Sequence, residues 1–270
     1  MILTETFNFL KTKHTTLIKS LTITDARLGI HLTAVQLSDN SCGVASTNSS
    51  GNFRGGKTER DFSEFSPLKI KGRTISELFE MEKTSARIDA LRIAVLNAIS
   101  STLFRDGNYI ILEDTDPIDI IDLNSKKTIT IVGAFQSYMR KISGTENTLH
   151  VLEFNEHLFS EEHKQYYRPA EEYKSILPIS DIVIITGLSL VNNTIDGLLS
   201  AVSPQSQVIV TGPSSSIIPD VLFQNHVNII GATRITNTEL ALELASQEGS
   251  GYHLFKYCAQ KICILNTEKI

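Results

Sequence analysis

The sequence lacks the patterns of several classes of protein. No apolar run approaches about 20 residues, the length that a bilayer-spanning helix needs. No basic stretch offsets the formal net charge of −5, which argues against non-specific binding to nucleic acid. The start of the chain has no basic segment followed by a continuous apolar one, so we expect no secretory signal. We therefore expect neither a membrane nor a nucleic acid as a partner.

Residues typical of metal sites and nucleophilic catalysis are also sparse. The three cysteines, Cys42, Cys258 and Cys263, contain no C-x-x-C pair, so we expect free thiols and a reducing, cytoplasmic compartment. The seven histidines form no H-x-x-x-H pattern, and no strong metal signature is present. There is no G-x-S-x-G elbow around a nucleophilic serine. Catalytic and metal-binding residues therefore stay unassigned, and cofactors are unknown.

The first part of the chain predicts a small α+β domain. An amphipathic pattern indicates a helix near the start, and partial alternation predicts a meander of strands over 24–37 and 42–47. Capping-box spacing predicts a short helix from Thr74. An apolar stripe at helical spacing predicts a longer helix over 85–104.

The second part predicts a different architecture. An acidic segment over 113–127 leads into it, and we place the boundary near Leu123, which gives domains 1–123 and 124–270. Strands then alternate with helices, which predicts a Rossmann-like, doubly wound parallel sheet. We expect its first five strands in the order 3-2-1-4-5, with a sixth left open. The expected strands are 128–132, 148–152, 181–186, 207–211, 227–230 and 261–265.

Polar residues follow the central strands of this sheet. One buried strand ends in Thr186-Gly187, and the next ends in Thr211-Gly212. Parallel sheets bind ligands at the carboxyl ends of their strands. We therefore expect hydrogen bonds to a ligand from Thr186, Gly187, Asn192, Asn193 and Thr194.

The second of these strand ends continues into a serine-rich loop, Gly212-Pro213-Ser214-Ser215-Ser216. Successive hydroxyls and amides near a helix N-terminus can hold a phosphate or a carboxylate. The alternative is a turn that only caps the next helix. The loop has no basic residue, so charge would come from Arg234 or from Arg54. Arg54 belongs to the glycine-rich segment 48–56, which is either a plain connection or a lid.

The first strand of the sheet ends in a turn that falls short of the G-x-G-x-x-G fingerprint, since only Gly133 is present. Phe135 and Tyr138 would crowd a pyrophosphate, which disfavours the usual mode of NAD binding. Glu153 lies where Rossmann proteins place the acidic residue that holds a ribose. Gly133, Phe135 and Glu153 are therefore candidate contacts for a nucleoside-type ligand such as S-adenosylmethionine. The alternative for Glu153 is a strand-end carboxylate that faces water.

The runs TGLSLVNNTIDGLL, VIVTGPSSSIIPDVLF and VNIIGATRITNTE resemble the Rossmann-like domain of a domain-of-unknown-function family labelled "putative heavy-metal chelation". The resemblance is carried by Thr186-Gly187, Asn193-Thr194 and Gly212-Pro213-Ser214 at the strand ends. The first half, through Cys42-Gly43-Val44-Ala45 among other residues, is similar to the family's other domain, which resembles the N-terminal domain of enolase. The chain departs from the family at Arg87-Ile88-Asp89, where alanine and glycine are usual.

The resemblance implies a composite site in the cleft between the two domains. Our leading hypothesis is a cytoplasmic protein that binds a small anionic molecule there. The resemblance implies that this molecule chelates a heavy metal, so a heavy-metal ion or chelate is the expected cofactor. The alternative is a transferase or lyase that uses a nucleotide-derived cofactor, S-adenosylmethionine or NAD, at the strand ends. A third hypothesis is a non-catalytic binding module. Enzymatic activity and a homo-oligomer are left open.

Overall fold

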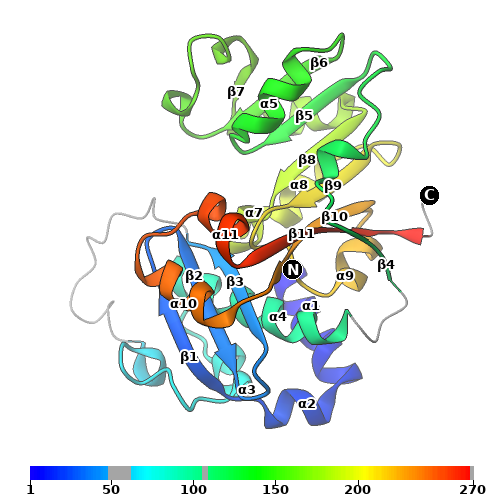
Figure 1. Cartoon of the computed structure of the whole chain (residues 1–270). Helices are drawn as coiled ribbons and strands as arrows, with labels where there is room; N and C mark the ends of the chain where they lie inside the picture. The colour runs from blue at the N-terminus through cyan, green and yellow to red at the C-terminus, as the bar shows by residue number, and fades with distance from the viewer. Residues whose placement is uncertain (48–61, 105–108, 268–270) are drawn as a thin grey trace.

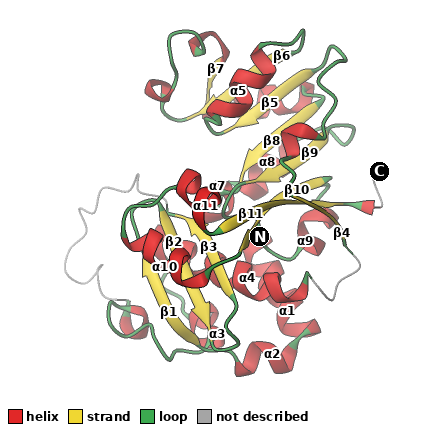
Figure 2. Cartoon of the chain, in the orientation of Figure 1, coloured by secondary structure: helices red, strands yellow, loops and turns green. Residues whose placement is uncertain are grey.

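The computed structural model describes residues 1–47, 62–104 and 109–267. Two β-sheets organise them (Figure 1), and helices flank both sheets (Figure 2). The small sheet has the order β1-β2-β3, and the large sheet has the order β4-β11-β10-β9-β8-β5-β6-β7. The segment 48–56, with Arg54 and the predicted choice between a connection and a lid, lies outside the described residues.

The small sheet is the predicted meander. β1 (Ile23–Leu28), β2 (Leu32–Leu37) and β3 (Cys42–Ser46) pair in antiparallel order. The predicted long helix is α4 (Ala86–Leu103), which packs against β2 and β3. α10 (Thr238–Ser246), from the other end of the chain, packs against β1 and β2. Helices from both halves therefore cover the small sheet.

Gly43 allows α4 to lie very close to β3. A Cβ atom at this position would lie 2.1 Å from the carbonyl oxygen of Ala94 and 2.3 Å from the amide nitrogen of Ala98. Both neighbours are backbone atoms of α4, so any side chain would push the helix away. The alanines on the helix and the glycine on the strand together set this packing distance.

The other helices of the first half also follow the sequence pattern. The amphipathic start forms α1 (Ile2–Lys13) and α2 (Thr15–Ser20). α3 (Ile75–Glu80) begins at the predicted capping box. The Thr74 hydroxyl accepts from the Glu77 amide, and the Glu77 carboxylate accepts from the Thr74 amide. Both predictions are confirmed.

The large sheet confirms the predicted α/β class. Six adjacent strands, from β10 to β7, pair in parallel, and β11 and β4 add an antiparallel edge. The strands are β4 (Ile110–Glu113), β5 (Thr128–Val132), β6 (Thr148–Glu153), β7 (Tyr167–Pro169), β8 (Ile182–Thr186), β9 (Gln207–Thr211), β10 (Ile229–Ile235) and β11 (Ala259–Leu265).

The predicted strand order needs one correction. The six predicted strands lie in the order 2-1-3-4-5-6, because the sequence analysis missed β7. β7 has only three residues and ends in Pro169, so it shows no strand pattern in the sequence. With β7 counted third, the parallel strands have the order 3-2-1-4-5 followed by a sixth, β10. β11, predicted as the sixth, is a seventh strand and is antiparallel to its neighbour.

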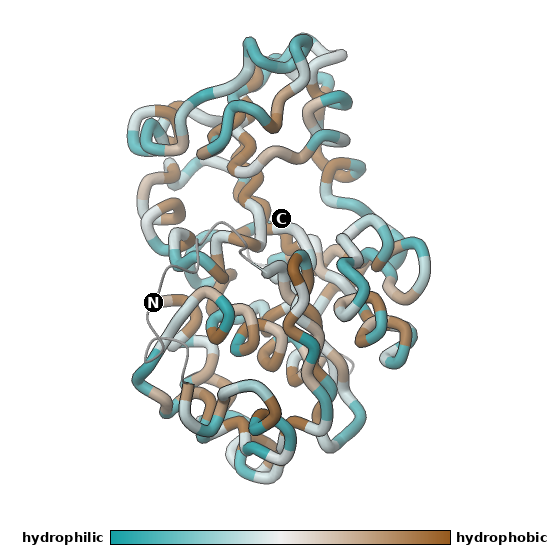
Figure 3. The backbone as a smooth tube through the Cα atoms, turned by 90° about the vertical axis from the view of Figure 1, so that its left-hand side faces the viewer, coloured by the Kyte–Doolittle hydropathy of each residue, from teal (hydrophilic) through white to brown (hydrophobic). Residues whose placement is uncertain are grey.

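Helices cover both faces of the large sheet, as doubly wound topology requires. α5 (Gln136–Ser143) packs on one face through Tyr138, Met139 and Ile142. α7 (Leu188–Val191), α8 (Ile195–Ala201) and α9 (Pro219–Gln224) pack on the other face. The strands between them are largely apolar (Figure 3), as expected for a sheet that is buried on both faces.

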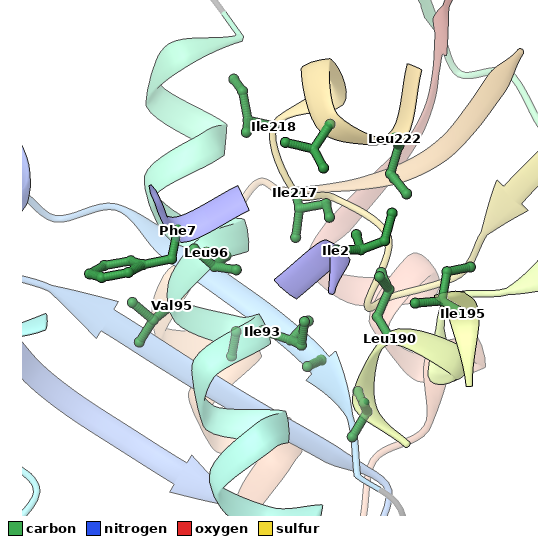
Figure 4. Close-up of a cluster of buried hydrophobic side chains, with 14 of the residues drawn as sticks. Ile2, Phe7, Ile93, Val95, Leu96, Leu190, Ile195, Ile217, Ile218 and Leu222 are labelled. Carbon is green, nitrogen blue, oxygen red and sulfur yellow. The ribbon is translucent and has the colours of Figure 1, made fainter. Parts of the chain in front are cut away.

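The α8–α9 face shares its core with the first half of the chain. Figure 4 shows Ile2 of α1 and Leu96 of α4 among side chains of α7, α8 and α9. β4, which precedes the predicted boundary near Leu123, pairs with β11 of the large sheet. The boundary itself and the likeness of the first half to the N-terminal domain of enolase stay predictions.

The structure also bears on the membrane and cysteine expectations. No helix within the described ranges has both the length and the hydropathy needed to cross a bilayer. Cys42, Cys258 and Cys263 are free and buried, as predicted. The cytoplasmic location stays a prediction.

Candidate functional site

A cavity of about 500 Å³ lies at the carboxyl ends of β5, β6 and β8. We call it the strand-end pocket. Seven predicted ligand contacts line it, namely Gly133, Phe135, Glu153, Thr186, Asn192, Asn193 and Thr194. Five further lining residues were not predicted from the sequence, namely Phe154, Glu171, Tyr173, Leu188 and Ser189. Sequence could not place Glu171 and Tyr173 there because they follow β7, the strand that was missed.

Backbone amides hold Glu153 at the end of β6. Its Oε2 accepts from the Ala134 amide at 3.1 Å, and its Oε1 accepts from the Phe154 amide at 2.8 Å and the Asn155 amide at 3.4 Å. An ionised carboxylate offers about four acceptor positions, so at least one stays free for a ligand. The carboxylate is thus fixed in place and can still accept a hydroxyl.

The turn after β5 is built around Gly133, whose φ of +102° favours glycine. A side chain at this position would also press on Thr186, with its Cβ 3.1 Å from the Thr186 Cβ. The Phe135 ring stacks on Tyr138, with ring centroids 5.2 Å apart. Phe135 follows Gly133 in the turn and Tyr138 lies in the first turn of α5, at the two positions where a G-x-G-x-x-G fingerprint has its other glycines.

The turn after α7 supplies polar groups on the opposite wall. Asn192 Oδ1 accepts from the Thr194 amide at 3.2 Å and from the Thr194 hydroxyl at 2.7 Å. Asn193 has a φ of +59°, a conformation that asparagine tolerates better than most residues. Its Nδ2 donates to Asp89 Oδ2 at 3.2 Å, so a carboxylate of α4 lies directly behind this wall.

The serine-rich loop is not part of the strand-end pocket. Ser214 Oγ accepts from the Ser46 amide at 2.8 Å, which ties the loop to the end of β3. Ser215 Oγ donates to backbone carbonyls, and Ser216 Oγ accepts from the Thr233 amide at 2.8 Å. All three serines are buried. Their hydroxyls bond within the fold, and none of them caps α9, whose N-cap is Ile218 with no side-chain cap bond, so the capping alternative is wrong. The anion cradle stays a prediction.

The remaining predicted residues are dispersed. Gly212 and Pro213 line a separate cavity, and the Gly187 amide donates to the Thr211 carbonyl at 2.7 Å. Arg234 forms an ion pair with Glu113 of β4 and does not line the strand-end pocket. Arg54 lies outside the described residues.

The charge of the strand-end pocket differs from the anion-binding expectation. Among the described residues that line it, the charged side chains are Glu153 and Glu171, with no lysine or arginine. These residues also fall between 132 and 198, so the pocket belongs to the Rossmann-like half. None of the described residues of the first half lines the pocket, and Asp89 contacts it through its bond to Asn193. This composition suits a neutral or cationic ligand that donates hydrogen bonds.

The residues do not fit a resident metal ion. In the described part of the chain, no three histidine, cysteine, aspartate or glutamate side chains come together as a ligand set. The cysteines are also poor ligands, because burial raises the pKa of the Cys42 thiol and of the Cys263 thiol to about 12. A cysteine binds a metal as the thiolate, which a raised pKa disfavours.

Comparisons with known proteins give a family but no activity. The model of DUF364, described as "Putative heavy-metal chelation", matches residues 116–264, and that of DUF4213, with the same description, matches residues 13–100. A crystal structure of a DUF364 protein of unknown function from Pyrococcus horikoshii has a TM-score of 0.75 and 22% identity, and covers 97% of this chain and 99% of its own. One from Desulfitobacterium hafniense has a TM-score of 0.74 and 17% identity, with coverages of 96% and 100%. No curated protein matches significantly.

Proposed function

Because the chain belongs to the DUF364 family, whose description as "Putative heavy-metal chelation" fixes no ligand, we propose a ligand from the chemistry of the strand-end pocket. The proposed ligand is a small molecule with a nucleoside moiety and no pyrophosphate. Its ribose would donate a hydroxyl to Glu153. Its remaining part would lie between the turn at Gly133 and the turn at Asn192–Thr194.

Glu153 is the observation that carries this proposal. It ends the second parallel strand, the position from which Rossmann proteins bind a ribose hydroxyl. The backbone amides of Ala134, Phe154 and Asn155 hold it in place and leave acceptor capacity. Adjacent apolar and aromatic side chains, Leu188, Phe154 and Tyr173, offer surfaces against which a base can lie.

The charge of the pocket narrows the ligand further. A pyrophosphate would meet Phe135 and two carboxylates, with no basic residue among the described lining. A sulfonium or an amine would be favoured by the same carboxylates. Of the nucleotide-derived cofactors considered, S-adenosylmethionine therefore fits better than NAD.

Calorimetric titration with S-adenosylmethionine, adenosine and NAD tests the proposal. We expect saturable binding of the first two and weaker binding of NAD. Glu153→Gln removes the charge of the acceptor, and a hydrogen bond to a charged group contributes about 1.5–3 kcal/mol, so affinity should fall about 10- to 100-fold. Glu156→Gln is the matched control, since Glu156 is nearby but does not line the pocket. Equal affinity of wild type and Glu153→Gln would contradict the role of Glu153.

The family description supports a second candidate, a ligand that itself chelates a metal. Since no protein ligand set is present among the described residues, the metal would enter with its chelator. Titration with Zn²⁺ or Ni²⁺ alone should then give no stoichiometric binding. Stoichiometric binding of either free ion, at submicromolar concentration, would contradict this version of the proposal.

A further inference from the structure

A second cavity, of about 280 Å³, lies at the same edge of the large sheet, next to β9, β10 and β11. We call it the aromatic pocket. α5 and α11 (Gly251–Tyr257) contribute to its walls, and Phe135 lines both it and the strand-end pocket. The family match and the proposed ligand of the first pocket say nothing about this cavity.

Strand register brings polar groups together beside this pocket. Thr233 of β10 is the direct partner of Lys261 in β11, and Gly231 is the partner of Thr211 in β9. Directly opposed residues in an antiparallel pair have Cβ atoms about 4.5–5.5 Å apart on one face of the sheet. The Thr233 hydroxyl and the Lys261 stem therefore lie side by side, and both residues line the cavity.

Among the described residues, the Thr233 hydroxyl finds no hydrogen-bond partner. The residue is only 6% exposed, and its Oγ1 is buried. Its backbone amide is satisfied by Ser216 Oγ at 2.8 Å, so only the side chain lacks a partner. Buried hydroxyls without partners are costly and uncommon in native proteins. Because Thr233 lines the aromatic pocket, a molecule bound there can supply this partner once the side chain turns its hydroxyl toward the cavity.

Asp116, Tyr138 and Lys261 form a hydrogen-bonded group in the wall of the same cavity. Asp116 accepts from the Tyr138 hydroxyl and from Lys261 Nζ, the latter at 2.6 Å. Burial, followed by the charge of Asp116, raises the pKa of Tyr138, so the phenol keeps its proton. An ammonium group has three donors, and this bond uses one of those on Lys261. Lys261 can therefore still donate to an acceptor in the pocket.

Aromatic rings make up much of the remaining wall. Phe135, Tyr252 and Phe255 line the cavity, and Lys261 Nζ lies 5.3 Å from the centre of the Phe255 ring. Tyr252 is 69% exposed, so it marks the entrance. Flat rings favour a flat ligand, because stacked and edge-to-face contacts both need planar partners.

We propose that the aromatic pocket binds a small planar ring compound with a carbonyl or carboxylate oxygen, which accepts hydrogen bonds from Lys261 and Thr233. The oxygen satisfies the Thr233 hydroxyl and the unused donors of Lys261, and the ring lies among Phe135, Tyr252 and Phe255. The proposal goes beyond the nucleoside proposal and does not depend on it. Together the two pockets would place two ligands on either side of Phe135.

Benzoate and benzamide are suitable probes, with cyclohexanecarboxylate as a non-planar control. Ligand-observed NMR titration of the full chain should show saturable binding of both ring probes and weaker binding of the control. Thr233→Val keeps the shape of the side chain and removes the hydroxyl, so affinity for benzoate should fall about fivefold, which corresponds to one hydrogen bond. Lys261→Met should weaken benzoate more than neutral benzamide, since it removes a charge.

Lys19→Met is the control, since Lys19 is an exposed lysine at the end of α2 that does not line the cavity. It should leave both affinities unchanged. Lys261→Met also removes the partner of Asp116 and could impair folding, but Thr233→Val removes a hydroxyl without a partner and should fold as wild type. Absence of saturable binding by both ring probes, or equal benzoate affinity in wild type and Thr233→Val, would overturn the proposal. Neither result affects the nucleoside proposal, because that proposal is tested separately by the titration of Glu153→Gln with nucleosides.

Discussion

Asn193 Nδ2 lies 3.2 Å from Asp89 Oδ2, so a buried carboxylate of the first half of the chain holds a side chain of the strand-end pocket. The other oxygen of Asp89 accepts from the Thr84 hydroxyl at 2.7 Å and from Arg92 at 3.3 Å. Asp89 is only 5% exposed. Its three donors come from three segments, and the carboxylate thereby links α4 to the turn after α7.

Asp89→Asn should therefore affect both stability and the pocket. The change leaves the guanidinium of Arg92, whose side chain is 11% exposed, without its counter-charge. Removal of one partner from a buried ion pair costs about 3–5 kcal/mol. We expect a smaller loss of about 2–4 kcal/mol, because Arg92 also donates to the carbonyls of Leu78 and Met81. Urea denaturation of the wild type and Asp89→Asn measures this loss in the free energy of unfolding.

The exposed pair between Lys11 and Glu80, 3.5 Å apart, provides the control. Glu80→Gln should change the free energy of unfolding by less than about 1 kcal/mol. If the two variants lose the same stability, Asp89 is not the buried link that its contacts suggest. Nucleoside affinity should fall in Asp89→Asn and stay unchanged in Glu80→Gln.

Sequence predicted the parts of the fold that depend on local pattern. The apolar strands β5, β8 and β9 and the capped helices α3 and α4 all have signals within a short window. β7 lacked such a signal, because three residues that end in proline do not show alternation. β4, with four residues, is likewise too short to show alternation, and α11 begins at Gly251, a residue type that disfavours helices.

The candidate site was predictable where it follows strand ends and not where it depends on register. Glu153 and Thr186 were found because each ends a recognisable strand. Thr233 and Lys261 are partners only through the antiparallel pairing of β10 with β11, which the sequence analysis took as a crossover. Asp89 did carry a signal, since it is an acidic residue in the first turn of α4, with Arg92 three residues later.

The capping box of α3 gives a stability prediction with a pH dependence. Thr74→Ala should cost about 1 kcal/mol, the usual effect of a lost N-cap. Hydrogen bonds from the Thr74 amide and hydroxyl lower the pKa of Glu77 below its usual value of 4.5. A lowered folded-state pKa stabilises the protein above the unfolded pKa, and this contribution is lost as the pH falls through the folded one.

Chemical denaturation of wild type and Thr74→Ala at pH 7 and below pH 4 tests this. The difference between the two should narrow at the lower pH, because protonation of Glu77 weakens its bond to the Thr74 hydroxyl, which only the wild type has. The backbone amide at position 74 donates to Glu77 in both proteins, so its contribution cancels. A constant difference across this range would show that the carboxylate contributes nothing to the cap.

The three buried cysteines predict slow alkylation of the native protein. Burial raises the pKa of Cys42 and of Cys263 to about 12, and it also raises the pKa of Cys258. Since the thiolate is the nucleophile, iodoacetamide at pH 8 should label the native chain far more slowly than the denatured chain. Mass spectrometry should find three labels in denaturant without prior reduction. Fewer than three would reveal an oxidised pair and contradict the free-thiol prediction.

The last prediction concerns Gly231 and tests how tightly the chain packs beside the aromatic pocket. A Cβ atom here would lie 2.2 Å from Thr211 Oγ1 and 2.5 Å from Pro117 Cγ. Gly231→Ala should thus destabilise the protein by about 1–3 kcal/mol, the usual cost of overpacking. Gly144→Ala is the control, since a Cβ there meets nothing closer than 3.9 Å and should change stability little. The added Thr211→Ala change removes the nearer clash and should recover part of the loss in Gly231→Ala. If the double variant is no more stable than the single one, the close contacts that remain in it, with Pro117 Cγ at 2.5 Å and Thr211 Cβ at 2.8 Å, set the limit at this position.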